Sequence, residues 1–162
     1  MAYLPTPEES NLCEQIVRAY TPISTPCESD EVNLVVKIYH DKDASKSGKM
    51  TMTIDLASMS SLIELKGPIC NCEYKGQRNC TIYGRECYRK RFIMISAGSG
   101  ITPMIQILRA IAADISDSTE CHLLSGNHCE EDILRKIRLD TLAKENAPRF
   151  WVVDTLSSPC GG

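Results

Sequence analysis

The segment that most constrains the fold runs from Arg91 to Pro103 and reads RFIMISAGSGITP. An apolar run is followed by a turn of small residues, and Thr102 and Pro103 then precede apolar residues at helical spacing. Threonine is favoured at a helix N-cap and proline at the first helical position. The sequence therefore predicts a strand, a tight turn and a helix capped by Thr102. Backbone N–H groups at such a helix start bind anions, usually phosphate, although isolated motifs of this kind also occur in turns that bind nothing.

Composition and charge exclude several classes of protein. The chain has 162 residues and a net charge of −3, so it is long enough for one ordinary domain or two small ones and lacks the basic excess of nucleic-acid-binding proteins. No apolar run has the length of a membrane span, and the first residues lack a signal-peptide pattern. We therefore expect a soluble, cytoplasmic protein without a nucleic-acid or membrane partner.

Cysteines are numerous, with nine in the chain. An odd number without a secretion signal is not typical of a disulfide framework, so we expect reduced thiols. Cys70, Cys72, Cys80 and Cys87 form the one group that suggests zinc, but they lack the paired C-x-x-C spacing of structural zinc sites. The sequence therefore predicts no metal site.

The two halves of the sequence differ in pattern. Before the central segment we expect short strands, including Val32–Tyr39, a short helix at residues 49–57 and a polar linker at residues 85–91. After it, apolar runs at Cys121–Ser125 and Phe150–Val153 predict strands. A capping-box pattern from Asn127 to Glu130 predicts a helix between these two strands.

These patterns predict two subdomains, a partial antiparallel β-barrel followed by a partial parallel-sheet α/β domain. We expect residues 1–17 to be a loose leader, residues 18–88 to form the barrel and residues 89–162 to form the α/β domain.

Five short motifs occur in the order found in the ferredoxin–NADP reductase superfamily, which the chain resembles. They are Arg18-Ala19-Tyr20-Thr21 (similar to the flavin-binding Arg-x-Tyr-Ser/Thr motif), Val35–Tyr39 (the strand after it), Gly48–Thr51 (the phosphate-side turn and helix start), Gly67-Pro68, and Ala97–Pro103 (the nucleotide-domain motif). Within the superfamily, the runs Gly84–Phe92 and Gly126–Leu134 look most similar to the flavin reductase portion of fungal-type assimilatory nitrate reductases. The resemblance extends from Arg18 to about Pro159.

The resemblance implies an FAD-dependent oxidoreductase module that passes electrons from NADH or NADPH through the flavin toward a haem and molybdenum nitrate reductase centre. In a complete relative, the haem domain is the expected electron acceptor, and nitrate assimilation is the implied process. Residues 18–88 then become an FAD-binding domain and residues 89–162 an NAD(P)H-binding domain. The protein supplies positioning and electrostatics, because the redox chemistry belongs to the cofactor.

The site residues implied by the resemblance fall in both halves of the chain. Those expected to bind cofactors are Arg18, Ala19, Tyr20, Thr21, Val35, Val36, Lys37, Ile38, Tyr39, Lys49, Met50, Thr51, Gly98, Gly100 and Thr102. Thr21 and Thr102 are also expected to take part in catalysis. Arg18 offers the FAD pyrophosphate a forked, permanently charged donor, and Met50 and Thr51 offer N–H groups at a predicted helix start.

Three features differ from the family's pattern. Ala97 and Cys70 stand where the family has glycine, and the methyl group at residue 97 is expected to crowd a close backbone approach or to require a disfavoured φ. Strands at both ends of the family's pattern are missing, so an alternative is a truncated, non-catalytic remnant with weak or no flavin binding. The predicted strand end Ser125–Asn127 carries no carboxylate for a ribose 2′-hydroxyl, which leaves NADH and NADPH both open.

Overall fold

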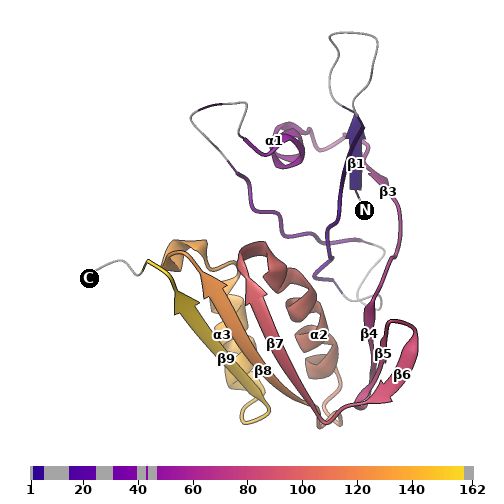
Figure 1. Cartoon of the computed structure of the whole chain (residues 1–162), viewed down its shortest axis with the longest axis vertical. Coiled ribbons are helices and arrows are strands. Elements are labelled where there is room, and N and C mark those ends of the chain that lie inside the picture. Colours follow the sequence, from indigo (N-terminus) through magenta and orange to yellow (C-terminus); the bar gives the residue numbers. More distant parts are fainter. Residues whose placement is uncertain (1, 6–14, 25–30, 40–42, 44–46, 159–162) are drawn as a thin grey trace. The chain divides into compact units, whose positions relative to one another are not determined.

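The computed structural model describes residues 2–5, 15–24, 31–39, 43 and 47–158 (Figure 1). The chain divides into two compact units, the first made of Met1–Thr21 and Val36–Ile69 and the second of Pro22–Val35 and Cys70–Gly162. The contacts therefore group residues 70–88 with the second unit. The boundaries expected at residues 17 and 88 concern cofactor-binding domains, and they stay predictions.

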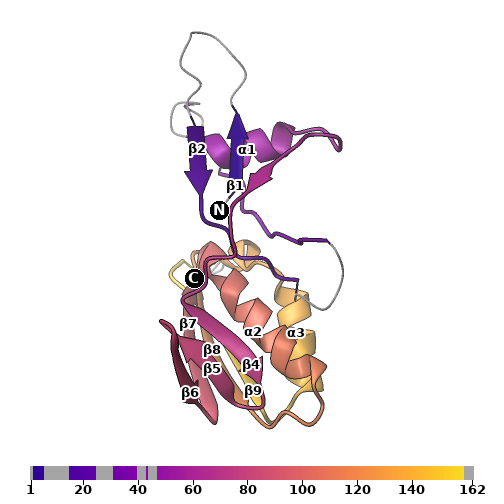
Figure 2. The same cartoon turned by 90° about the vertical axis from the view of Figure 1, so that its right-hand side faces the viewer.

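The first unit is a small antiparallel sheet with one helix. Its strands lie in the order β2-β1-β3, with β1 at Ala2–Pro5, β2 at Gln15–Arg18 and β3 at Glu64–Leu65, and its helix α1 is Lys49–Leu56 (Figure 2). Ile16 and Met50 are buried together, and Tyr20 and Ile54 pack against them. The short helix is confirmed. The leader expected to be loose, residues 1–17, contains the strand β1, which pairs with both β2 and β3. The sequence of β1 lacks a strong strand pattern, so the strand was not expected.

The strand predicted at Val32–Tyr39 is wrong, because none of residues 31–39 is in a strand. The backbone there makes isolated hydrogen bonds, from Ile23 N to Asn33 O (2.8 Å) and from Gly48 N to Tyr39 O (3.1 Å). A β-branched sequence favours an extended backbone, but a strand also needs a neighbouring ladder of hydrogen bonds.

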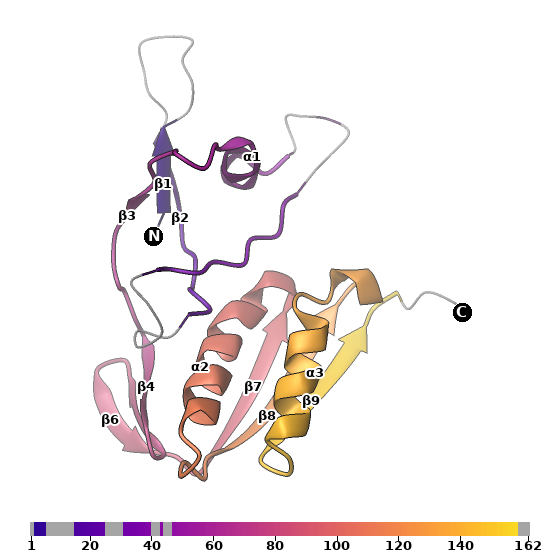
Figure 3. The same cartoon turned by 180° about the vertical axis from the view of Figure 1, so that it is seen from behind.

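The second unit is built on a parallel sheet in the order β7-β8-β9, with β7 at Arg91–Ala97, β8 at Glu120–Asn127 and β9 at Phe150–Leu156. The crossover helices α2 (Thr102–Ala113) and α3 (Lys136–Glu145) lie side by side over one face of this sheet (Figure 3). Two right-handed crossovers that progress in the same direction place their helices on the same face. Together with the first unit, this sheet confirms the predicted fold class.

The two faces of the parallel sheet differ because alternate side chains point to opposite sides. Met94, Leu123 and Phe150 point toward the helices and are buried against Leu108 and Ile111 of α2. The opposite face carries Ile93, Ile95, Leu124, Trp151 and Val153, each at least 40% exposed. Neither α2 nor α3 covers that second face.

A three-stranded antiparallel meander precedes the parallel sheet. It consists of β4 (Cys72–Gly76), β5 (Asn79–Ile82) and β6 (Arg85–Tyr88), in that order. The linker predicted at residues 85–91 is therefore wrong. Tyr83 and Gly84, with φ values of 48° and 75°, form a two-residue hairpin turn that returns the chain as β6.

Both predicted helix starts in this unit need correction. The turn after β7 is a 3-10 helix, η2 (Gly98–Ile101), which runs directly into α2, so Thr102 is a helical residue and not the N-cap. Its hydroxyl donates to Ser99 O (3.3 Å). The capping box after Asn127 does not form a cap either. Residues Glu130–Asp132 form a 3-10 turn, η3, and α3 begins after Arg135, which has a φ of 61°.

Asp117, in the loop between α2 and β8, joins the meander to the parallel sheet. It is 1% exposed, and its carboxylate accepts hydrogen bonds from Tyr74 OH, from Gln77 N (3.1 Å) and from the Thr119 hydroxyl (2.6 Å) and N–H (3.0 Å). Arg149 donates to its backbone carbonyl. Burial alone would raise the pKa of Asp117. The hydrogen bonds from Thr119, Tyr74 and Gln77 together outweigh burial, so the pKa lies below the ordinary 3.8.

Replacing Asp117 should destabilise the second unit. We expect Asp117→Asn to lower the free energy of unfolding by about 2–3 kcal/mol at pH 7, because buried donors lose a charged acceptor. A carboxylate with a lowered pKa stabilises the fold above its unfolded pKa, and this contribution is lost as the pH falls through the folded pKa. The difference between wild type and variant should therefore shrink below about pH 4.

Urea unfolding of both proteins from pH 7 to pH 3 measures this difference. The control is Glu73→Gln, which changes an exposed carboxylate on β4 and should change stability by no more than about 0.5 kcal/mol. An Asp117→Asn difference that does not depend on pH would contradict the argument.

Candidate functional site

The first unit brings three of the predicted site segments together at the start of α1. Tyr20 packs against the cluster that contains buried Met50, and Gly48, immediately before α1, donates its N–H to Tyr39 O. Burial is the largest effect on Tyr20 and raises its pKa above the usual value, while the charge of Arg18 lowers this pKa and Tyr39 raises it.

The N-terminus of α1 has the properties of an anion site. The N-cap residue is Gly48, so no side chain at this position caps the first N–H groups of the helix. The first turn also carries no acidic residue that would repel an anion. A Cβ at Gly48 would lie 2.5 Å from the Thr51 hydroxyl oxygen, so the tight approach there requires glycine. The Thr51 hydroxyl donates a hydrogen bond to Gly48 O (3.0 Å). The backbone N–H groups of the first helical turn can therefore donate to a ligand.

The other predicted residues of this region differ in exposure. Arg18, Ala19 and Lys49 are exposed, Tyr39 is half-exposed, Thr51 is buried, and Thr21, Val35, Val36, Lys37 and Ile38 are half-buried. Arg18 donates to Val17 O (2.9 Å) and keeps its guanidinium at the surface. The Lys37 ammonium lies 5.9 Å from the centre of the Tyr39 ring, a cation–π distance. The ring face of Tyr39 is thus already in contact with a cation.

In the second unit, the predicted turn lies at the carboxyl end of β7, where open α/β sheets bind their ligands. Gly98 has a φ of 50°, and a Cβ at Gly98 or Gly100 would meet no atom within 4 Å, so the backbone here is open to a ligand. Ala97 has a φ of −135° and a ψ of 128°, an ordinary extended backbone. Residue 97 therefore does not need a disfavoured φ, and the crowding of a ligand by its methyl group stays a prediction. Thr102 is 7% exposed.

A row of polar side chains at the same edge was not recognised in the sequence. Ser96, Ser125 and Asp154 are paired in register on β7, β8 and β9. Ser125 accepts a hydrogen bond from Asn127 (3.1 Å), and Asp154 binds Lys136 (3.3 Å). Ser96 Oγ and Asp154 Oδ1 are buried without a hydrogen-bond partner in the described residues. Each of the three residues ends an apolar run, and this is the signal that could have identified them.

The structure therefore assembles two groups of predicted residues, one in each unit, whereas Val35 packs in the second unit against the buried cluster around α2 and joins neither group. Thr21 belongs to the first unit and Thr102 to the second, so their catalytic assignment stays a prediction. Within the described ranges, no cluster of three or more His, Cys, Asp or Glu side chains is arranged to hold a metal ion. None of the helices described has the length and apolar character that a membrane span requires.

Two family models match the chain in succession. Residues 9–74 match the oxidoreductase FAD-binding domain, and residues 94–162 match the oxidoreductase NAD-binding domain. The first match contains the residues gathered around α1, and the second contains most of β7, the turn after it and the polar row.

Similar proteins of known name agree with these matches. The chain is 40% identical over 146 residues to a nitrate reductase [NADPH] of Beauveria bassiana (90% of this chain, 16% of the relative) and 44% identical over 149 residues to one of Leptosphaeria maculans (92% and 17%). The crystal structure of the cytochrome b5 reductase domain of Ulva prolifera nitrate reductase is similar with a TM-score of 0.87 and 32% identity, covering 99% of this chain and 61% of that one. The chain thus spans about one sixth of the length of these curated relatives.

The unpaired hydroxyl of Ser96 leads to a stability prediction. We expect Ser96→Ala to leave the free energy of unfolding within about 0.5 kcal/mol of wild type or to raise it, because no hydrogen bond within the protein is lost. Ser125→Ala is the matched control on the neighbouring strand, and it should lower stability by about 1 kcal/mol through loss of the Asn127 contact. Thermal and urea unfolding without nucleotide measure both, and a larger loss at Ser96 would show that its hydroxyl has a partner.

Proposed function

Because the chain belongs to the ferredoxin–NADP reductase superfamily, and within it to the FAD- and NAD-binding reductase modules of the nitrate reductase type, we propose that it oxidises NAD(P)H through bound FAD and passes the electrons toward a haem centre. The observation that carries the proposal is that each of the two matched segments contains a backbone turn open to a ligand. One is the start of α1 after Gly48, and the other is the glycine turn η2 that begins at Gly98.

In this proposal the first unit holds FAD. The guanidinium of Arg18 and the N–H groups of Lys49, Met50 and Thr51 bind the pyrophosphate, because a charged fork and a helix N-terminus both favour phosphate oxygens. The ring of Tyr20 packs against the flavin, and Thr21 donates a hydrogen bond to the edge of the flavin ring. FAD, once bound, supplies the chemistry: it takes a hydride and releases electrons one at a time.

Residues 36–39 complete this proposed site along the flavin and its ribityl chain. Val36 and Ile38 supply apolar contacts, and Lys37 supplies a positive charge beside the Tyr39 ring. Val35 packs against the buried cluster of the second unit, so its contact with a cofactor rests on the motif resemblance alone. Ala19 contributes backbone rather than side-chain contact. All of these assignments derive from the motif resemblance stated above, and the grouping of Tyr20, Tyr39 and Gly48 in one unit supports them.

The second unit, in this proposal, holds the nucleotide at the carboxyl edge of its parallel sheet. Gly98 and Gly100 allow the pyrophosphate to approach the backbone, and the buried hydroxyl of Thr102 holds the turn through Ser99 O. We favour NADPH as the donor, because β8 ends in Ser125–Asn127 without a carboxylate for a ribose 2′-hydroxyl and the two fungal relatives carry NADPH in their names. The cytoplasmic location expected from the sequence stays a prediction.

The experiment that tests the function uses the whole chain. The purified protein is reconstituted with FAD, freed of excess flavin by gel filtration and assayed for ferricyanide reduction with NADPH and with NADH. We expect retained flavin and turnover that depends on both FAD and nucleotide, with higher kcat/KM for NADPH. Retention of flavin without turnover, or no retention, would favour the non-catalytic alternative.

Arg18 provides a direct test of the flavin site. Arg18→Ala should weaken FAD binding by about 10- to 100-fold, since loss of a charge-assisted hydrogen bond costs about 1.5–3 kcal/mol. Arg85→Ala removes an exposed arginine of the β6 strand and serves as the matched control, with unchanged affinity. Flavin fluorescence titration measures both affinities, and circular dichroism checks that the fold is retained. Equal FAD affinity in the two variants would contradict the assignment of Arg18.

A further inference from the structure

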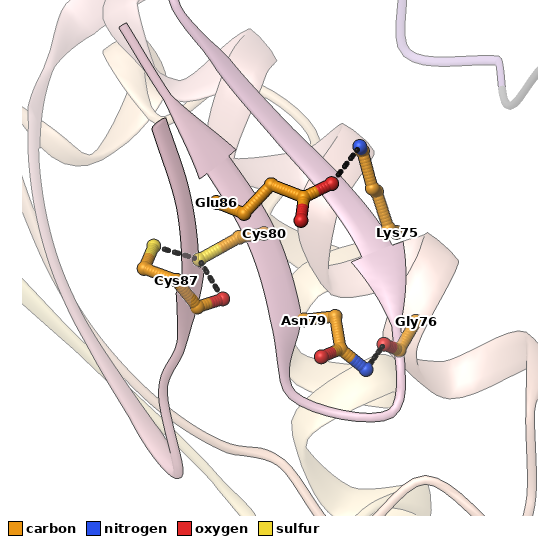
Figure 4. A network of polar contacts seen from close by, with 6 residues as sticks. All are labelled: Lys75, Gly76, Asn79, Cys80, Glu86 and Cys87. Carbon is orange, nitrogen blue, oxygen red and sulfur yellow. Dashed lines mark hydrogen bonds and ion pairs between the residues drawn. The ribbon is translucent and has the colours of Figure 1, made fainter. Parts of the chain in front are cut away.

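The β4–β6 meander contains a pair of cysteines that the proposed cofactor sites do not use. Cys80 on β5 and Cys87 on β6 are directly opposite each other in the antiparallel ladder, and their Sγ atoms are 2.8 Å apart (Figure 4). Both are free thiols. Residues directly opposite in antiparallel strands have Cα atoms about 4.5–5.5 Å apart, which lies within the roughly 4.4–6.8 Å that disulfides span. The backbone therefore already satisfies the spacing of a bridge.

The two thiols differ in access. Cys80 is 1% exposed, and its thiol is hydrogen-bonded with Cys87 Sγ. Cys87 is half-buried and lines an open hollow of about 450 Å³ together with Lys75, Glu86 and Tyr88. Burial, followed by the hydrogen bond with Cys87, raises the pKa of Cys80 to about 11. A reagent in solution therefore reaches Cys87 first, and Cys80 lies behind it as a second sulfur within reach.

We propose that Cys87 and Cys80 form a thiol–disulfide exchange site whose co-reactant is a low-molecular-weight disulfide, RSSR. The Cys87 thiol loses its proton to solvent, and the thiolate attacks one sulfur of RSSR, forms a mixed disulfide and releases one RS⁻. Cys80 then attacks the Cys87 sulfur, loses its proton, forms the Cys80–Cys87 bond and releases the second RS⁻. The two protein thiols are oxidised, and RSSR is reduced to two RSH.

Other nearby cysteines are less well placed for this exchange. Cys72 on β4 is exposed, but it is opposite Ile82 and not opposite a cysteine. Cys70 is exposed but donates its S–H to Cys72 O (2.8 Å). Cys121 is fully buried under α2, and burial raises the pKa of its thiol to about 12. Compared with these three cysteines, the geometry thus favours the pair on β5 and β6.

Peptide mapping of the whole chain tests the proposal. The native protein is incubated with glutathione disulfide, free thiols are blocked with N-ethylmaleimide, and the protein is digested with trypsin without reduction. Trypsin cleaves after Arg78, Arg85 and Arg89, which places Cys80 and Cys87 in separate peptides. We expect these two peptides to be joined, with loss of two hydrogens and no retained glutathione. Dithiothreitol should separate them.

Two variants and one control identify the order of attack. In Cys80→Ser, Cys87 should keep glutathione as a stable mixed disulfide, because the second sulfur is absent. In Cys87→Ser, Cys80 should react at least about tenfold more slowly than Cys87 does in wild type, because it is buried. Cys70→Ser is the matched control and should form the bridge as wild type does.

Three results would overturn the proposal. One is a major link to the peptide of residues 67–75, which carries Cys70 and Cys72. Another is a stable glutathione adduct on Cys87 while Cys80 is present. The last is equal reactivity of Cys80 and Cys87 in the folded protein. None of these readouts depends on flavin or nucleotide, so they are independent of the proposed reductase activity.

Discussion

Asp117 is a buried carboxylate at the amino end of the parallel sheet, and segments far apart in the sequence converge on it. Tyr74 and Gln77 of the meander and Thr119, just before β8, donate to its carboxylate, and Arg149, just before β9, donates to its backbone carbonyl. The ionised carboxylate is stable because every group that contacts it is a donor. Burial and the hydrogen bond to Asp117 in turn raise the pKa of Tyr74 to about 12, so its proton stays in the network at neutral pH.

This network lies at the end of the sheet opposite the candidate nucleotide site. The amino ends of the strands are tied together by charge-assisted hydrogen bonds, whereas the carboxyl ends carry Ser96 and Asp154 with unpaired polar atoms. A site that binds a ligand benefits from polar groups whose partners are missing until the ligand arrives, provided that the rest of the sheet is held firmly. In the parallel sheet of the second unit, the hydrogen-bonded polar groups around Asp117 lie at the amino ends of the strands, and the Ser96 and Asp154 atoms without partners among the described residues lie at the carboxyl ends.

Local signals in the sequence predicted the turn between β7 and α2, the helix α1 and the family, because each depends on residues close together in the chain. The failures come from longer-range causes. Val32–Tyr39 has the composition of a strand but lacks a paired neighbour, and β6 was missed because Tyr83 adopts a positive φ that Asn or Gly usually supplies. The polar row was missed because strand register aligns Ser96 with Ser125, which lies 29 residues further along the chain.

The second unit is discontinuous, because Pro22–Val35 belongs to it while the residues on either side belong to the first unit. Ile23 is part of the buried cluster around α2, and Arg109 on α2 donates to Ile23 O (2.6 Å). During synthesis on the ribosome, Ile23 emerges long before the helix that it packs against. The residues up to Ile69 that form the first unit here also emerge before α2, so Ile23 remains without its partners until the α/β sheet is made.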